Sequence, residues 1–313
     1  MGTIRRGGDH VRAVAATAVG GPEVLRVVER PDPVAGPGKV LVRVRAVSVN
    51  PADLGARRGL VPGGPVPPPF VLGWDFAGEV VTVGDGVTDL RPGTRVAGMV
   101  PWYLTRGDSG AYAELVSAER DWVVPIPDDL DLAAAATVAL NASTARQALE
   151  LIAAEPGTPL LVTGASGGVG GFAVQLAAQA GLRVIAGAGR DDEEWVRGLG
   201  AAEVLPRTAD LATVGPVPAV LDAVPVGTPA AAVADGGTLV TTRPTPSVDP
   251  ARRVRQHVVM VRLDPSMLAG LMAAVAEGRL RTRVAVTLPL AEAADAHRLV
   301  EAGGLRGKVV LVP

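Results

Sequence analysis

A short apolar strand followed at once by a glycine-rich turn and a helix is the feature that most constrains this fold. Residues 160–162 read Leu-Leu-Val, five glycines follow within residues 164–171, and residues 172–180 form an Ala-rich helical pattern. This order places free main-chain N–H groups and the positive end of a helix dipole at one point, where a pyrophosphate binds well. It therefore predicts a dinucleotide site made by Gly164, Ala165, Ser166, Gly167, Gly168 and Val169.

The match to the dinucleotide fingerprint is incomplete. If Gly167 and Gly170 are its second and third glycines, Ala165 occupies the place of the first. Gly167 and Gly170 would let the backbone approach the phosphates and let the helix pack on the strand. Glycine turns between a strand and a helix also occur without a ligand. The flanking strand and helix, and a second strand expected at residues 183–187, favour dinucleotide binding.

Composition excludes several other classes of protein. The chain has 313 residues, enough for two domains, and its 30 basic and 32 acidic residues nearly balance, so neither a nucleic-acid nor a membrane partner is expected. Without cysteine it forms no disulfide and has no thiolate nucleophile. Residues 1–12 are polar, lack the apolar core of a signal peptide and are expected to form a disordered tail. We expect a soluble, cytoplasmic protein that acts on a small molecule.

The pattern changes near residue 125. The first part is β-rich, with strands expected at residues 40–49, 78–83 and 95–100 and a proline-rich loop at residues 60–70. Short strands then alternate with helices, which predicts a doubly wound parallel sheet. Further strands are expected at residues 203–205, 219–223, 238–242, 257–261 and 308–312, and helices at residues 131–137, 144–154, 193–199, 265–276 and 291–301.

Motifs spread over residues 13–312 resemble one family. They are Gly20-Gly21-Pro22-Glu23-Val24-Leu25, Ser48-Val49-Asn50-Pro51-Ala52-Asp53, Gly73-Trp74-Asp75-Phe76-Ala77-Gly78, Gly110-Ala111-Tyr112-Ala113-Glu114, the glycine turn and Gly307-Lys308-Val309-Val310-Leu311. Their order resembles the zinc-independent, zeta-crystallin-like quinone-oxidoreductase branch of the medium-chain dehydrogenase/reductase superfamily. The resemblance implies an α/β fold: a GroES-like catalytic domain from residues 13–128 and 265–313, a Rossmann domain from residues 129–264, and a homodimer.

The resemblance also indicates whether the chain binds a catalytic metal ion. Zinc members carry a cysteine and a Gly-His-Glu segment at the catalytic metal, and the corresponding stretches here read Ser48-Val49-Asn50-Pro51 and Gly73-Trp74-Asp75. The histidines at positions 10, 257 and 297 lack ligand spacing. We therefore expect no metal.

The end of the second Rossmann strand bears on the choice of cofactor. An NAD enzyme usually places Asp or Glu there for the ribose 2′-OH, whereas this strand ends at Gly187 and the first cation after it is Arg190. A small residue leaves room for a 2′-phosphate, and a guanidinium binds one bidentately. The sequence thus predicts NADPH as cofactor, with Gly187 and Arg190 in its site. Alternatively, Arg190 begins a solvated helix end and pairs with the acidic run that follows.

Further site residues follow from the resemblance. Asn50 and Asp53 match residues that face the nicotinamide and substrate, and we assign them as catalytic, with Asn50 also binding cofactor; plain turn and cap chemistry is the alternative. Asn141 and Thr144 match a segment near the nicotinamide, although either could cap a helix. Lys308 matches the terminal Gly-Lys at the cofactor site, or is a solvated lysine at a strand edge.

Aromatic residues suggest a substrate pocket. Where many relatives carry tyrosines the chain has Gly55 and Val61, so no tyrosine proton donor is evident. Trp74, Trp102 and Tyr103 are candidates to line an apolar pocket for a flat substrate, with core packing as the alternative for Trp74. The prediction is an NADPH-dependent reductase of quinones or other α,β-unsaturated carbonyl compounds, acting by hydride transfer without metal. The alternatives are an enoyl reductase of a biosynthetic pathway and an NADPH-binding sensor or scaffold without turnover.

Overall fold

The computed structural model describes residues 10–224 and 229–313. The chain forms two compact units, the first from residues 1–140, 263–276 and 283–313 and the second from residues 141–262 and 277–282. Residues 1–9 of the expected tail lie outside the described residues. The last part of that expectation is wrong, because residues 10–12 begin a strand that pairs with residues 29–31. No helix in the described ranges is long and apolar enough to cross a membrane.

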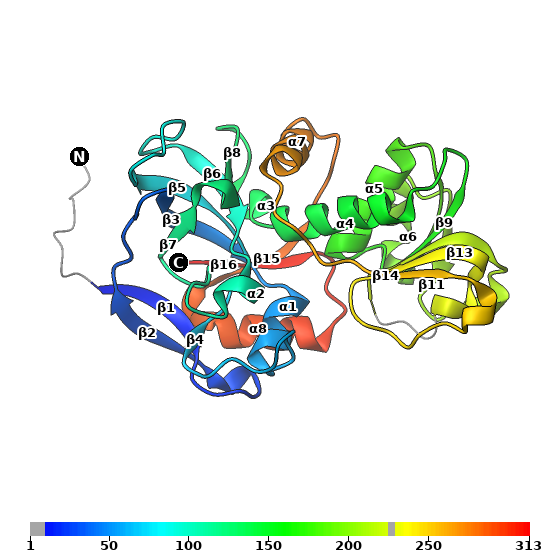
Figure 1. Cartoon of the computed structure of the whole chain (residues 1–313), viewed down its shortest axis with the longest axis horizontal. Helices are drawn as coiled ribbons and strands as arrows, with labels where there is room; N and C mark the ends of the chain where they lie inside the picture. Colours follow the sequence, from blue (N-terminus) through cyan, green and yellow to red (C-terminus); the bar gives the residue numbers. More distant parts are fainter. Residues whose placement is uncertain (1–9, 225–228) are drawn as a thin grey trace. The chain divides into compact units, whose positions relative to one another are not determined.

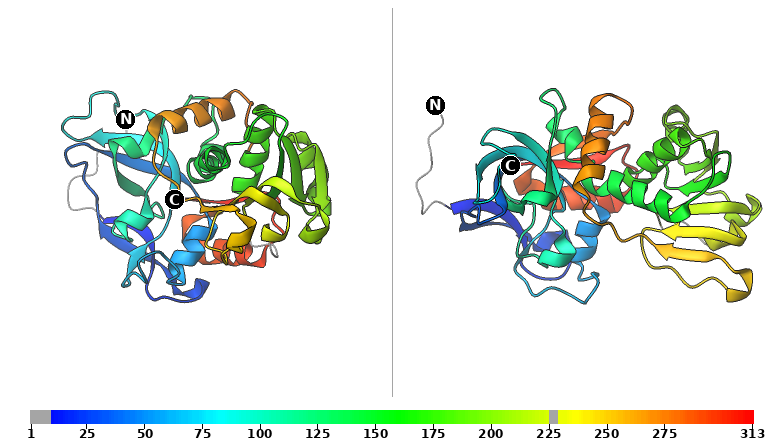
Figure 2. Two further views of the ribbon diagram at one scale, coloured as in Figure 1. Left: turned by 45° about the vertical axis from the view of Figure 1, so that its right-hand side comes forward. Right: turned by 45° about the horizontal axis from the view of Figure 1, so that its top comes forward.

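The second unit contains a six-stranded parallel sheet with the order β11-β10-β9-β12-β13-β14. Figure 2 shows these strands, green to yellow, side by side. Numbered from β9, the order is 3-2-1-4-5-6, the doubly wound Rossmann arrangement that the sequence predicted. The strands are β9 (Pro159–Thr163), β10 (Arg183–Ala188), β11 (Glu203–Pro206), β12 (Val217–Asp222), β13 (Val233–Thr241) and β14 (Arg255–Val258).

Apolar side chains of the central strands form the core of this unit. Leu161, Val220 and Leu239 are buried and cluster with Ile185 of the neighbouring strand. Such strands are buried on both faces and read as continuous apolar runs. The helices here are α5 (Gly168–Gln179) and α6 (Glu193–Gly198), with most of α4 (Ala139–Ile152).

The first unit is built on a seven-stranded sheet in which segments from both ends of the chain meet. Its order is β15-β16-β3-β5-β6-β8, and β7 also pairs with β3. The last strand, red in Figure 1, therefore lies between β15 and β3 and is not at an edge. The strands are β3 (Lys39–Ser48), β5 (Asp75–Val83), β6 (Arg95–Met99), β7 (Leu115–Glu119), β8 (Val123–Pro125), β15 (Val284–Pro289) and β16 (Lys308–Val312).

Strand β3 shows why this sheet forms. Val40, Val42 and Val44 are buried on one face, whereas Arg43 and Arg45 are exposed. A smaller sheet has the order β2-β1-β4. Its strands are β1 (His10–Ala16), β2 (Leu25–Pro31) and β4 (Phe70–Val71), and the helices of this unit are α1 (Pro51–Arg57), α2 (Trp102–Thr105), α3 (Leu132–Ala135), α7 (Pro265–Ala276) and α8 (Ala293–Ala302).

The structure differs from the expected elements at several places. Strand β15 was not predicted, and β13 begins five residues before the expected start at residue 238. Helix α4 begins at Ala139 instead of Thr144. The units divide at residues 140 and 141, later than the expected boundary at 128, and residues 277–282 join the second unit. Helix α7 and strand β16 have the expected bounds.

Candidate active site

The glycine turn follows β9 and leads directly into α5. Gly164 has a φ of +63°, and a β-carbon on it would lie 2.6 Å from Val224. A β-carbon on Gly170 would lie 2.2 Å from the carbonyl oxygen of Gly164. Both positions therefore require glycine for the packing of the turn against its own surroundings.

Gly167 is different. Its φ is −82°, which any residue adopts, and the nearest atom to an added β-carbon is the Gly164 oxygen at 3.2 Å. Neither the backbone angle nor intramolecular packing demands a glycine here. A ligand that approaches the backbone would demand it, and Gly167 immediately precedes the first turn of α5, whose N–H groups lack partners within the helix. The turn therefore fits the pyrophosphate of a dinucleotide.

The turn lies where the strand order reverses. Strand β9 has β10 on one side and β12 on the other, the topological switch point at which ligands of such sheets bind. At the carboxyl ends of these central strands the Thr163 hydroxyl donates to Asp222 Oδ1 at 2.5 Å. Burial raises the pKa of Asp222, and the Thr163 hydrogen bond opposes this shift.

Two arginines are candidates to bind a 2′-phosphate near the end of β10. Gly187 lies within β10, and Arg190 is exposed in the short 3-10 helix Arg190–Asp192. A β-carbon on Gly189 would lie 3.4 Å from Arg207 Nη2, so this exposed arginine reaches the same strand end from beyond β11. Sequence reasoning missed Arg207 because it considered only the first cation after β10. Asn141 and Thr144 are buried on α4 in the same unit.

In the first unit, Asn50 and Asp53 brace the start of α1. The main-chain N–H of Asn50 donates to Asp53 Oδ2 at 2.8 Å, and that of Gly73 donates to Asp53 Oδ1 at 3.0 Å. The main-chain N–H of Asp53 in turn donates to the carbonyl oxygen of Asn50. These contacts are the ones expected if Asn50 and Asp53 only cap the helix. The catalytic assignment of Asp53 stays a prediction.

Asn50, Asp53, Ser48, Asp75 and Lys308 form one polar group, which we call the Asn50 cluster. Asp75 Oδ2 accepts hydrogen bonds from the Asn50 amide at 2.9 Å and the Ser48 hydroxyl at 3.1 Å. Lys308 Nζ donates to Asn50 Oδ1 at 2.6 Å and to the Val49 carbonyl oxygen at 2.8 Å. The lysine fixes which end of the amide faces Asp75. Lys308 is therefore not a solvated lysine at a strand edge.

Burial dominates the electrostatics of this cluster. It raises the pKa of Asp53 to about 7 and that of Asp75 to about 6, while the Lys308 charge opposes both shifts. Burial also lowers the pKa of Lys308 to about 8, against the attraction of the two carboxylates. The Lys308 ammonium and the two carboxylates therefore stabilise one another's charged forms against the effect of burial. Asp75 Oδ1 also accepts the main-chain N–H of Leu140 at 2.6 Å, near the start of α4.

The three aromatic candidates occupy different environments. Trp74 and Tyr103 lie against each other, with ring centroids 5.6 Å apart and planes inclined by 32°. Trp102 is fully buried against Phe70, and its indole N–H donates to the Val71 carbonyl oxygen at 2.7 Å. This position favours a packing role for Trp102 over contact with a substrate.

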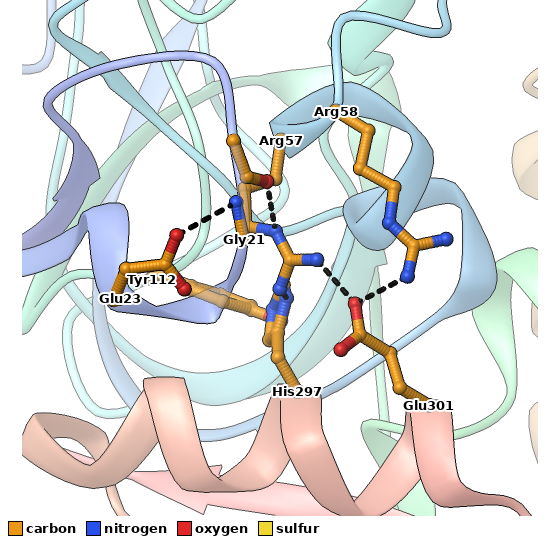
Figure 3. Close-up of polar contacts among 8 residues, drawn as sticks. Gly21, Glu23, Arg57, Arg58, Tyr112, His297 and Glu301 are labelled. Carbon is orange, nitrogen blue, oxygen red and sulfur yellow. Dashed lines mark hydrogen bonds and ion pairs between the residues drawn. The ribbon is translucent and has the colours of Figure 1, made fainter.

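A second polar network stabilises the far end of α1 (Figure 3). The buried Arg57 side chain donates to the Gly20 carbonyl oxygen and to His297 Nδ1, and it pairs with Glu301. Because a guanidinium only donates, the His297 proton lies on Nε2 and is donated to the Tyr112 hydroxyl 3.0 Å away. Burial lowers the pKa of His297 to about 3, so the ring is neutral. This histidine is structural.

The donor set of the Asn50 cluster does not suit a transition metal. The stretches that correspond to the cysteine and the Gly-His-Glu segment of the zinc members read Ser48-Val49-Asn50-Pro51 and Gly73-Trp74-Asp75, and the indole of Trp74 has no lone pair to offer. Within residues 10–224 and 229–313 no group of three or more His, Cys, Asp or Glu side chains could hold a metal ion. Lys308 also places a positive charge among these residues, which disfavours a cation.

Comparisons with known proteins agree with this geometry. Residues 36–128 match the alcohol dehydrogenase GroES-like domain family, and residues 199–311 match the zinc-binding dehydrogenase family. The chain is 31% identical to a chloroplast envelope quinone oxidoreductase homolog of Arabidopsis thaliana, over 94% of this chain and 95% of that protein. It is 35% identical to a trans-enoyl reductase of Aspergillus japonicus, over 55% of this chain and 52% of that protein.

The structure of the quinone oxidoreductase from Coxiella burnetii is also similar, with a TM-score of 0.87 and 28% identity over 97% of this chain and all of that one. Some curated relatives are matched over only 52–61% of their length. The fold and the relatives together define a medium-chain dehydrogenase/reductase. The chain belongs to the quinone-oxidoreductase-like branch of that superfamily, as its motifs predicted, and it is an oxidoreductase related to quinone oxidoreductases and enoyl reductases.

Proposed function

We propose that this protein is an NADPH-dependent reductase of quinones or other α,β-unsaturated carbonyl compounds that works without metal. The observation that carries the proposal is the Asn50 cluster. Where zinc relatives place metal ligands, this chain has an amide held between Asp75 and Lys308. Such a site has no Lewis acid, so the acceptor must be electrophilic enough to take a hydride unaided. Conjugated carbonyl compounds meet that condition, whereas simple ketones do not.

The second unit supplies the cofactor site in this proposal. Bound NADPH would provide the hydride, with its pyrophosphate on the turn at Gly167 and the first turn of α5. Arg190 and Arg207 would bind the 2′-phosphate. In the first unit Lys308 keeps the Asn50 amide in one orientation, and we retain Asn50 as a residue that faces the nicotinamide.

The test is steady-state oxidation of NADPH with a panel of acceptors. We expect turnover with 1,4-benzoquinone, menadione or a conjugated enone, and none with cyclohexanone. Extended treatment with a strong chelator should leave the activity unchanged, because no metal is part of the site. Activity that is lost to the chelator and restored by zinc alone would overturn the proposal.

Two other outcomes separate the alternatives. A protein that is stabilised by NADPH and oxidises it with no acceptor of the panel would be the sensor or scaffold. A strong preference for enoyl thioesters over quinones would favour the biosynthetic enoyl reductase, which the similarity to a trans-enoyl reductase supports. A homodimer and a cytoplasmic location remain predictions, and light scattering of the purified protein tests the first of them.

A further inference from the structure

The indole N–H of Trp74 is a buried donor whose role the fold does not explain. The residue is 8% exposed, and Nε1 has no hydrogen-bond partner within the described part of the chain. The comparable donor of Trp102 is bonded to the Val71 carbonyl oxygen. A buried unpaired N–H costs about 1–3 kcal/mol, and folded proteins retain few of them. Such a group in an active-site segment points to a partner that arrives with the substrate.

The surroundings of Trp74 hold this donor in place. The main-chain N–H of Gly73 is fixed by Asp53, and the carbonyl oxygen of Trp74 accepts the main-chain N–H of Val100 at 2.8 Å. The Asp75 carboxylate belongs to the Asn50 cluster. Tyr103 packs against the indole at a small inclination and so restrains the plane of the ring. The N–H lies in that plane, at the ring edge, and is therefore oriented before any ligand binds.

The chemistry of the donor selects its partner. An indole N–H donates one hydrogen bond, accepts none and keeps its proton, so the partner must be an acceptor. The carboxylate oxygens of Asp53 and Asp75 and the amide oxygen of Asn50 already accept other donors. In zinc relatives the residue at this place binds the metal, and a catalytic zinc polarises carbonyl oxygens.

We propose that Trp74 Nε1 donates a hydrogen bond to the carbonyl oxygen of the substrate, as the uncharged counterpart of that metal. The inference rests on the proposed function and names the group that recognises the conjugated carbonyl. As the acceptor takes a hydride, a C–H bond forms and an electron pair moves onto this oxygen. The N–H stabilises the developing charge without giving up its proton, and water then protonates the oxygen.

The test removes only the N–H. Site-specific replacement of Trp74 by 3-benzothienylalanine, in which sulfur takes the place of the N–H, preserves the shape of the side chain. We expect kcat/KM for menadione to fall about 100-fold, as for the loss of one donor directed at an oxyanion. The increase in Tm on adding NADPH should be unchanged. An unchanged kcat/KM would overturn the inference.

Trp102 provides the matched control for stability. The same replacement there breaks a hydrogen bond to Val71 and should lower the Tm of the ligand-free protein. At Trp74 it removes an unpaired buried donor, so the Tm should stay the same or rise. Equal losses of Tm at both positions would show that the Trp74 N–H has a structural partner and would overturn the inference.

A spectroscopic measurement separates this inference from the proposed function. The chain has four tryptophans, whose indole ¹⁵N–¹H signals can be resolved, with that of Trp74 identified by its loss in Trp74→Phe. Saturating menadione in the presence of NADP⁺ should move the Trp74 signal downfield. Turnover without this movement would overturn the inference and leave the proposed function intact. Movement without turnover would support carbonyl recognition and overturn the proposed function.

Discussion

Gly167→Val is the substitution that tests the cofactor site most directly. The φ of −82° at this position suits valine, and the nearest atom to the new β-carbon is the Gly164 oxygen at 3.2 Å. The side chain would therefore occupy the space that we assign to the pyrophosphate. We expect a folded protein that no longer binds a dinucleotide.

The expected magnitudes follow from the position of Gly167 at the N-cap of α5. Valine is a poorer N-cap than glycine, so the substitution should cost about 1 kcal/mol of stability. That corresponds to a decrease in Tm of roughly 2–4 °C for a protein of this size class. A cofactor at 100 times its Kd stabilises the native state by about 2.7 kcal/mol. Wild-type protein should therefore gain roughly 5–10 °C with NADPH, and the variant should gain nothing.

Thermal unfolding with and without NADPH measures both effects, and Gly170→Ala is the matched control. A β-carbon at Gly170 would lie 2.2 Å from the Gly164 oxygen and 2.7 Å from its carbonyl carbon, so the turn or helix must shift. The smaller substitution should therefore cost more stability than valine does at Gly167. If Gly167→Val unfolds without a cooperative transition, Gly167 is needed for the fold itself and the reasoning from its φ and packing is wrong. If the variant still gains Tm with NADPH as wild type does, the turn is not the phosphate site.

The remaining predictions concern charged side chains. Arg190→Ala and Arg207→Ala should each weaken NADPH binding by roughly 1–3 kcal/mol and leave NADH binding almost unchanged; calorimetric titration decides, and equal weakening of both cofactors would refute the assignment. In wild type, the raised pKa of Asp53, about 7 against 3.8, should make the free energy of unfolding fall as pH rises from about 4 to 7. Lys308→Met removes a charge that lowers the pKa values of Asp53 and Asp75, so both pKa values should rise in the variant. Urea unfolding should then show the free energy of unfolding still decreasing at a higher pH than in wild type. If the free energy of unfolding stops decreasing at the same pH in variant and wild type, Lys308 does not influence the pKa values of these carboxyl groups.

Helix α4 shows where sequence reasoning met its limit. The sequence placed the helix start at Thr144, but α4 begins at Ala139. The Asp75 carboxylate, 65 residues earlier in the chain, accepts the main-chain N–H of Leu140 and so stabilises an earlier start. Strand β15 was missed although its own sequence carries a strand signal. Its residues alternate between partly buried and exposed, with Val284, Val286 and Leu288 on one face, and this is the period-2 pattern that also marks β3.

The sequence alone determined the strand, glycine turn and helix around Gly167 and the alternation of short strands with helices that makes a doubly wound parallel sheet. These features depend on apolar runs and backbone freedom, which are local properties of the chain. Only the tertiary structure decided which polar side chains meet. Lys308 reaches Asn50 across 258 residues, Arg57 reaches His297 across 240, and Trp74 keeps a donor without a partner. Side-chain partners depend on how distant segments pack together, and a local sequence pattern does not predict that packing.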